Sequence, residues 1–166
     1  MLISKIEKTL KKICEMVSFI IYALVIIIVL QVLLRYVFDQ GAVALEEMNW
    51  HFYAILFMTG LTYAELENKH VGVDLLSSKF SSRTKGIIGL LGYTLLLLPF
   101  LIIIFNHSLP FVYDSFRTME KSLSPSGLSY RFLIKSLIPI SALMLFASTI
   151  LKILHFIKMI KDNDGN

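Results

Sequence analysis

Charged residues are scarce in this chain of 166 residues. Only 17% of the sequence is Asp, Glu, Lys or Arg, whereas 56% is hydrophobic and the mean hydropathy is +0.72. A soluble domain of average composition carries about a quarter charged residues. A soluble protein this short could not bury so much apolar surface, so we expect lipid to cover much of it. The composition argues against a soluble domain and predicts one compact membrane domain over residues 1–166.

Cysteine is nearly absent, and so are the residue groups that carry chemistry. The single cysteine, Cys14, excludes an internal disulfide and is expected to pack as a small apolar residue. No nucleophile, metal-ligand cluster or phosphate-binding loop accompanies the acidic residues, so we expect no enzyme activity, catalytic residue, metal or cofactor. The net charge of +4 lacks the basic stripe interleaved with aromatics that nucleic-acid binding needs, so nucleic acid is not an expected partner.

Long apolar runs with few charges are what the sequence has instead. A helix rises about 1.5 Å per residue, so about 20 apolar residues cross a hydrocarbon core of about 30 Å. Because lipid offers the backbone no hydrogen-bond partners, each run should be helical. We predict an all-α integral membrane protein with four transmembrane helices, over residues about 14–35, 46–66, 86–106 and 131–156. The second span is the shortest and most polar. The first is too long for a removed signal peptide and lacks a cleavage site.

Lysines and arginines are unevenly divided between the two ends of these helices. Eleven lie in the N-terminal tail, in the loop after the second span and at the C-terminal end, and five lie in or beside the first and third loops. The positive-inside rule then places both termini in the cytoplasm. The first loop, with Asp39, Glu46 and Glu47, faces outward in this orientation.

The third loop, residues 106–131, contains a helical pattern of its own. Leu109, Val112 and Phe116 recur at helical spacing, and a proline near the start suits a first helical turn. The pattern predicts an amphipathic helix over residues 109–121 that lies in the membrane interface. The alternative is that the third span simply continues past the membrane. The Ser-Pro-Ser-Gly segment that follows should turn the chain into the last span.

An acidic pair, Glu46 and Glu47, precedes Trp50 and His51 at the start of the second span. Carboxylates suit a helix N-terminus, where the macrodipole is positive, and tryptophan suits the headgroup level. In a second interpretation, Glu47 and His51 share one helix face and engage a polar partner on another helix or subunit. Both interpretations stay open.

Three further charged or titratable residues lie at the edges of the spans. Arg35 closes the first span, as an interfacial charge or as a partner for lipid phosphate or an acidic residue of another chain. His70, in the loop after the second span, is expected to be solvated or to cap a helix. Lys135 is close enough to the start of the fourth span to reach the interface.

The predicted spans contain no acidic residue near the middle of the membrane. Nor are two of them interrupted at matching positions in two halves, which is typical of a transporter's own substrate site. Four such helices make a poor transport pathway alone, but they could form a scaffold or partner for another membrane protein. The alternative is a homo-oligomeric four-span channel or small exporter, for which few polar residues are available: Thr59, Thr62, Thr94 and Ser141.

Four short motifs follow one another along the chain. They are Leu34-Arg35-Tyr36-Val37-Phe38; Leu45-Glu46-Glu47 with Trp50-His51; His70-Val71-Gly72-Val73-Asp74; and Ser124-Pro125 with Arg131, Ile134-Lys135 and Ile138-Pro139. In this order, with four spans and cytoplasmic termini, they resemble the small membrane subunit, of DctQ type, of the tripartite ATP-independent periplasmic (TRAP) transporters. The resemblance extends over nearly the whole sequence.

The resemblance implies a function and a set of partners. It implies a non-catalytic, multi-pass subunit of the bacterial cell inner membrane that braces a large elevator-type permease subunit. The large subunit would hold the sodium and substrate sites, and a periplasmic substrate-binding protein would deliver an organic acid such as a dicarboxylate, a 2-oxo acid or sialic acid. Residues expected to contact the partner subunit or phospholipid are Arg35, Glu46, Glu47, Trp50, His51, His70, Asp74, Arg131 and Lys135.

Overall fold

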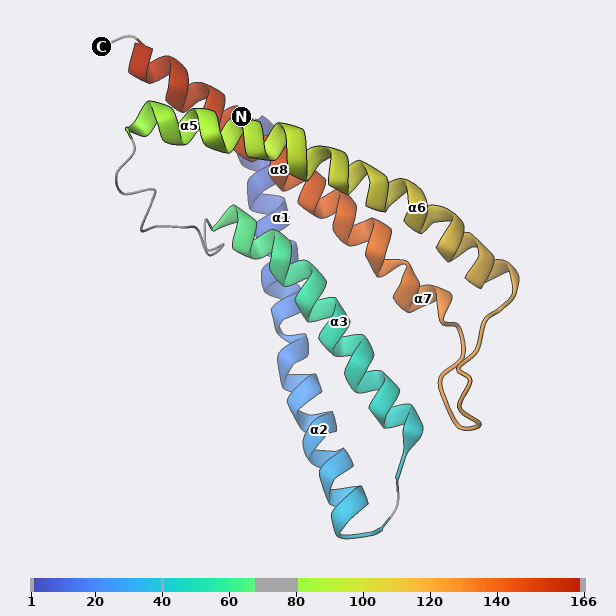
Figure 1. Cartoon of the computed structure of the whole chain (residues 1–166). Coiled ribbons are helices and arrows are strands. Elements are labelled where there is room, and N and C mark those ends of the chain that lie inside the picture. The colour runs from blue at the N-terminus through green and yellow to red at the C-terminus, as the bar shows by residue number, and fades with distance from the viewer. Residues whose placement is uncertain (1, 40, 68–80, 165–166) are drawn as a thin grey trace.

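A computed structural model describes residues 2–39, 41–67 and 81–164, and these residues form helices joined by loops, without a strand (Figure 1). In chain order the elements are α1 (Leu2–Ser18), α2 (Ile20–Tyr36), α3 (Val43–Leu66), α5 (Ser82–Leu91), the π-helix η1 (Gly92–Leu97), α6 (Leu98–Arg117), α7 (Phe132–Lys135) and α8 (Leu137–Asp164). The expected residues His70 and Asp74 lie outside the described ranges. The all-helical prediction is therefore confirmed for the described residues.

Three helical stretches in the described residues are long and apolar enough to cross a membrane. They are Ser4–Tyr36, Arg83–Arg117 and Phe132–Lys161. They include the first, third and fourth predicted spans. The second predicted span corresponds to α3, a helix of 24 residues that is not among the three, so this span and the orientation of the chain stay predictions.

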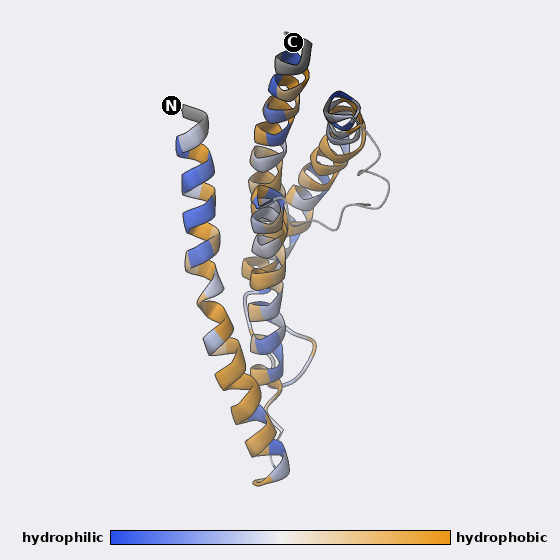
Figure 2. Ribbon diagram, turned by 90° about the vertical axis from the view of Figure 1, so that its left-hand side faces the viewer, coloured by the Kyte–Doolittle hydropathy of each residue, from blue (hydrophilic) through white to orange (hydrophobic). Residues whose placement is uncertain are grey.

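The large apolar side chains face outward, as lipid-facing side chains do. No residue of α2 is buried, and Ile26 on this helix is 66% exposed. Figure 2 shows a long hydrophobic stretch of ribbon below the more polar N-terminal part of the first helix. A contiguous apolar surface of this size needs lipid or a protein partner to cover it.

The helix from Ser82 to Arg117 is continuous, and this differs from the separate amphipathic helix predicted over 109–121. Residues 109–117 are the last turns of α6, and Pro110 lies inside that helix without ending it. The expected alternative, a third helix that continues into the loop region, is what the structure shows. The helix changes geometry elsewhere: η1 lies just before Pro99, and the Leu98 N–H donates to the Tyr93 carbonyl, five residues back. Because proline has no N–H to donate, a wider turn beside it leaves the helix unbroken.

Helix α8 is the centre of the arrangement. On one side it runs parallel to α3, since Ser141 Oγ lies 3.4 Å from Met58 Sδ and Lys152 lies beside Leu66 at the other end. On the other side it packs against α5 and α6. Small residues make the close approach between helices possible, which is the usual means of helix association in lipid. The side chains that are fully buried are Thr62, Ser115, Ser148 and Thr149.

Two glycines show how closely α5 and α8 approach. A Cβ atom added to Gly89 would lie 2.6 Å from Phe156 Cζ, whereas one added to Gly92, three residues on, would meet nothing within 4 Å. The Phe156 ring also packs against Tyr93, with centroids 5.4 Å apart, so it has little room to move aside.

We expect Gly89→Ala to destabilise the protein by about 1–3 kcal/mol, because overpacking a close contact forces the helices apart. Gly92→Ala is the matched control and should be neutral or slightly stabilising, because alanine favours the helix. Thermal unfolding of the purified protein in detergent measures both effects. Equal unfolding temperatures for the two variants would contradict the close α5–α8 contact.

Candidate functional site

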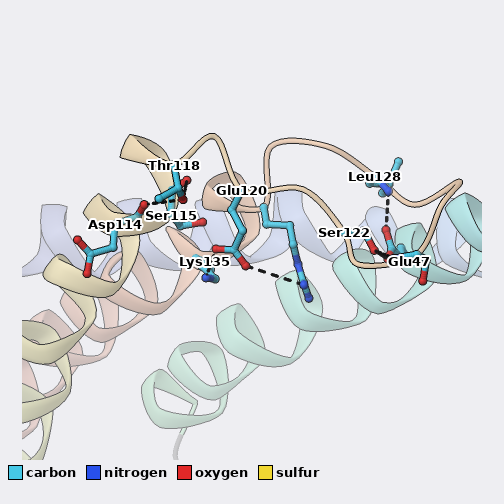
Figure 3. A network of polar contacts seen from close by, with 10 residues as sticks. Glu47, Asp114, Ser115, Thr118, Glu120, Ser122, Leu128 and Lys135 are labelled. Carbon is cyan, nitrogen blue, oxygen red and sulfur yellow. Dashed lines mark hydrogen bonds and ion pairs between the residues drawn. The ribbon is translucent and has the colours of Figure 1, made fainter.

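Glu47, in the first turns of α3, holds the long loop between α6 and α7. One of its carboxylate oxygens accepts a hydrogen bond from Ser122 Oγ, and the other accepts one from the Leu128 backbone N–H at 2.6 Å (Figure 3). These contacts join positions 75 and 81 residues apart in the chain. Hydrogen bonds to a carboxylate are among the stronger kind in proteins. We name the group Glu47, Glu120, Ser122, Leu128, Arg131 and Lys135 the loop clasp.

The loop is folded to present these donors to Glu47. The Gly127 N–H donates to the Ser124 carbonyl at 3.0 Å, which closes a turn with proline at its second position. The Ser122 N–H donates to the Leu128 carbonyl at 3.0 Å and brings the two Glu47 partners side by side. A Cβ atom on Gly127 would lie 2.4 Å from Ser122 Cβ and 2.9 Å from Glu47 Oε1. Glycine at this position therefore allows the close approach.

Glu120 holds the other half of the clasp. Its carboxylate accepts a hydrogen bond from Lys135 Nζ and lies 3.9 Å from Arg131 Nη1, and its carbonyl accepts from the Arg131 N–H at 3.0 Å. Lys135 Nζ also lies 4.0 Å from the centre of the Phe111 ring, so its charge has a carboxylate and an aromatic face as neighbours. These contacts tie the loop to α6 and to the start of the last helical pair.

The lysine also changes the acidity of Glu120. The hydrogen bond from the Lys135 ammonium group holds the pKa of Glu120 below its usual value, and the neighbouring Arg131 acts in the same direction. Glu120 is therefore ionised throughout the neutral range. The contact contributes to stability above the pKa that Glu120 has in the unfolded chain and is lost as pH falls through the lower folded-state pKa.

The structure brings together three of the residues predicted from sequence and separates the others. Glu47, Arg131 and Lys135 belong to the loop clasp. Trp50 is 71% exposed and makes no hydrogen bond to a residue of the clasp. Arg35, at the end of α2, is exposed and forms no ion pair within the described residues.

The remaining predicted residues have weaker roles in the described part of the chain. Glu46 lies beside Glu47 in the first turn of α3, is half-buried, and makes no side-chain hydrogen bond or ion pair to a described residue. His51 shares the helix face of Glu47, as expected from the four-residue spacing, and is half-buried. The structure assigns it no hydrogen bond with another described residue.

Two residues of the clasp were not found from the sequence. Ser122 and Glu120 showed no motif of their own, because their partners lie on other elements. Pairing Glu120 with Lys135 required knowing that the chain turns back after residue 117. The Ser-Pro-Ser-Gly segment did signal that turn, but not that Glu47 would accept the N–H of Leu128, the residue after it.

A second polar group lies inside the helices, at the opposite end of α3. Tyr93 Oη donates to Glu65 Oε1 at 2.5 Å, and Glu65 is only 3% exposed. Lys152, on α8, is also buried, at 9% exposure. Glu65 lies near the end of the second predicted span, residues 46–66, and no motif in the sequence points to its partner. Its partner comes from η1, where only the tertiary structure brings it near.

A cavity of about 680 Å³ opens beside Glu65 between α3 and η1. Its walls are mostly apolar and include Leu61, Leu96, Phe100 and Leu145. Among the described residues, no group of three or more His, Cys, Asp or Glu side chains is placed to hold a metal ion. The helices are thus joined by polar contacts at both ends of α3. We call these contacts the polar ties: the loop clasp around Glu47 at one end, and the Tyr93–Glu65 hydrogen bond at the other.

Comparison with known proteins agrees with the motif order. The family model of the DctQ component of tripartite ATP-independent periplasmic transporters matches residues 24–159, which is most of the chain. A search of curated proteins finds no match. The matched range extends from α2 to the last turns of α8 and contains every residue of the loop clasp.

The clasp predicts what happens when Glu47 is removed. In Glu47→Ala the Ser122 hydroxyl and the Leu128 N–H lose their acceptor, so the loop should open and the Leu128 amide should exchange with solvent several-fold faster. Glu46→Ala, next to it, removes a carboxylate without such partners and is the control. Hydrogen exchange of the purified protein measures both. Unchanged exchange at residues 120–131 in Glu47→Ala would contradict the clasp.

The Glu120 contact predicts a pH dependence. Glu120→Gln should lower the unfolding temperature at pH 6–7, where wild-type Glu120 is ionised and bound to Lys135. Below the usual pKa of about 4.5 for this group, the difference between variant and wild type should shrink, and it should vanish once pH is below the folded-state pKa. Thermal unfolding from pH 7 to pH 3 measures this. A constant difference across that range would show that Glu120 does not act through its charge.

Proposed function

Because the chain belongs to the DctQ family, as the small membrane component of a TRAP transporter, we propose that it braces the large permease subunit in the bacterial cell inner membrane. The family links it to that large subunit and to a periplasmic substrate-binding protein. The chain would cross the membrane in four passes and would take no part in catalysis. Sodium and the transported organic acid, of the carboxylate class, would bind to the large subunit.

The observation that carries the proposal is the family match together with the exposed apolar surface. Leu96 is 74% exposed, Ile103 57% and Ile26 66%, on three different helical segments. Lipid covers part of such a surface, and a second membrane subunit could cover the rest. A bracing subunit needs a surface of this kind on a frame that holds its shape.

The polar ties supply the frame. The loop clasp joins the start of α3 to α6 and α7, and the Tyr93–Glu65 hydrogen bond joins the end of α3 to η1. The α3 helix is thus attached at both ends to the second half of the chain. This attachment supports the proposal that the chain keeps its shape while the large permease subunit moves.

Exposed residues at the clasp end are the proposed points of contact with the permease or with phospholipid. Arg35 and Trp50 lie near this end of the molecule, on α2 and α3. Arg35 could pair with a lipid phosphate or an acidic residue of the permease. Trp50 has the size and exposure of an aromatic interface anchor.

Co-purification tests the proposal directly. The tagged chain should retain the large permease subunit encoded with it in a 1:1 complex, and only membranes that contain both subunits and the binding protein should take up the organic acid with sodium. Trp50→Ala should lower the yield of the permease several-fold. The matched control is Tyr113→Ala, which removes an aromatic of similar exposure, 63%, from α6.

Other results would count against the bracing function. Sodium-dependent uptake or ion conductance by the chain alone in liposomes would show that it forms its own pathway, as a channel or exporter would. Normal uptake by the permease without the chain would show that no brace is required.

A further inference from the structure

A stripe of lysines runs along the outward face of α1. Lys5, Lys8 and Lys12 are spaced three and four residues apart, which places them on one side of a helix, and all three are exposed. The opposite side of α1 is packed: Leu10 is 8% exposed and Cys14 is 5% exposed. In Figure 2 this N-terminal helix alternates between hydrophilic and hydrophobic ribbon before it becomes uniformly hydrophobic.

The fourth lysine of α1, Lys11, differs from the other three because acidic side chains neutralise its charge. Lys11 Nζ lies 2.8 Å from Glu67 Oε1 and 3.3 Å from Glu7 Oε1, so its charge serves the contact between α1 and the end of α3. Lys5, Lys8 and Lys12 form no ion pair with a described residue. They leave three positive charges on one face with no partner in the described chain.

The position of the stripe along the helix sets its distance from the membrane. The charge-free run that begins at Met16 continues through α2, with one turn-like residue at Phe19 between the helices. At about 1.5 Å per residue, Lys12 lies about 6 Å beyond that run, and Lys8 about 12 Å beyond it. The headgroup layer is about 5–8 Å thick, so Lys12 is at phosphate depth. Lys8, and Lys5 with its long side chain, lie within about one Debye length of the surface.

Apolar residues flank the stripe on the membrane side. Ile13, the residue after Lys12, is 40% exposed, and Met16, one turn past Lys12, is 64% exposed. The lysines therefore lie at the depth of the headgroups, and the exposed apolar side chains lie nearer the hydrocarbon core. An anionic phospholipid has its phosphate and its acyl chains in the same order, so it matches both. An acidic protein surface would match the charges of the lysines, but it would not account for the exposed apolar residues beside them.

We propose that Lys5, Lys8 and Lys12 form a binding site for the headgroups of anionic phospholipids. The site anchors α1 at the membrane surface and holds the start of the first helix at a defined depth. This inference depends on α2 crossing the membrane and does not depend on the transport function.

Spin-labelled lipids test the site in the full chain. The purified protein is reconstituted in phosphatidylcholine, and electron spin resonance compares the binding of spin-labelled phosphatidylglycerol with that of spin-labelled phosphatidylcholine. Wild type should prefer phosphatidylglycerol at low salt, and the preference should fall as salt is raised. The variant Lys5→Gln/Lys8→Gln/Lys12→Gln should reduce the preference by about fivefold or more, as expected for the loss of several lysines at an anionic surface.

Two matched variants keep the result interpretable. Lys158→Gln/Lys161→Gln removes exposed lysines from the end of α8, at the same end of the molecule as the N-terminus (Figure 1), and should change the preference little. Lys5→Arg/Lys8→Arg/Lys12→Arg keeps the charge and should keep the preference, which also shows whether substitution alone disturbs folding.

Three outcomes would overturn the proposal. One is a wild type without preference for phosphatidylglycerol. Another is an equal loss per charge in the α8 variant, which would mean a diffuse charge effect. The third is a triple glutamine variant that keeps its lipid preference but no longer retains the permease subunit, which would make the stripe a protein-binding surface.

Discussion

The close contact between α3 and α8 is the interaction on which the other helices depend. Thr62 on α3 and Ser148 and Thr149 on α8 are fully buried, and their small side chains let the two helices approach. In a membrane the hydrophobic effect does not drive helices together, so packing of small residues and polar contacts must do so. With these two helices joined, α1 and α2 pack on one side and α5 and α6 on the other. Large apolar residues are left to face lipid or a partner.

Hydrogen bonds from two carboxylates attach both ends of α3 to the second half of the chain. Glu47 secures one end of α3 to the loop before α7, and Glu65 secures the other end to Tyr93. Each tie uses a carboxylate where water is partly or largely excluded, so its partners must be placed accurately. A small membrane subunit that supports a moving partner would gain from attachment at both ends. The lysine stripe of α1 would add a third attachment, to the membrane itself.

The sequence pointed to some residues of the loop clasp but not to the residues with which they pair. Glu47, Arg131 and Lys135 stood out because charges beside apolar runs are conspicuous. Glu120 and Ser122 did not, because hydrogen bonds between residues far apart in the chain leave no local pattern. For a related reason, the amphipathic helix predicted over 109–121 is not a separate helix in the structure, and its place in the membrane interface stays a prediction. Its periodicity was real, but nothing local distinguishes a new helix from the continuation of α6 through Pro110.

The sequence alone determined the all-helical class, the positions of three membrane-length helices and the family, because apolar run length and motif order are local properties. It also placed the charges at helix ends. Only the tertiary structure decided which helices touch, that α3 and α8 run side by side, and that Glu65 is buried against Tyr93. In a membrane, apolar faces toward lipid and toward another helix have similar composition. Small residues and single polar pairs therefore select the packing, and their effect appears only when the helices are assembled.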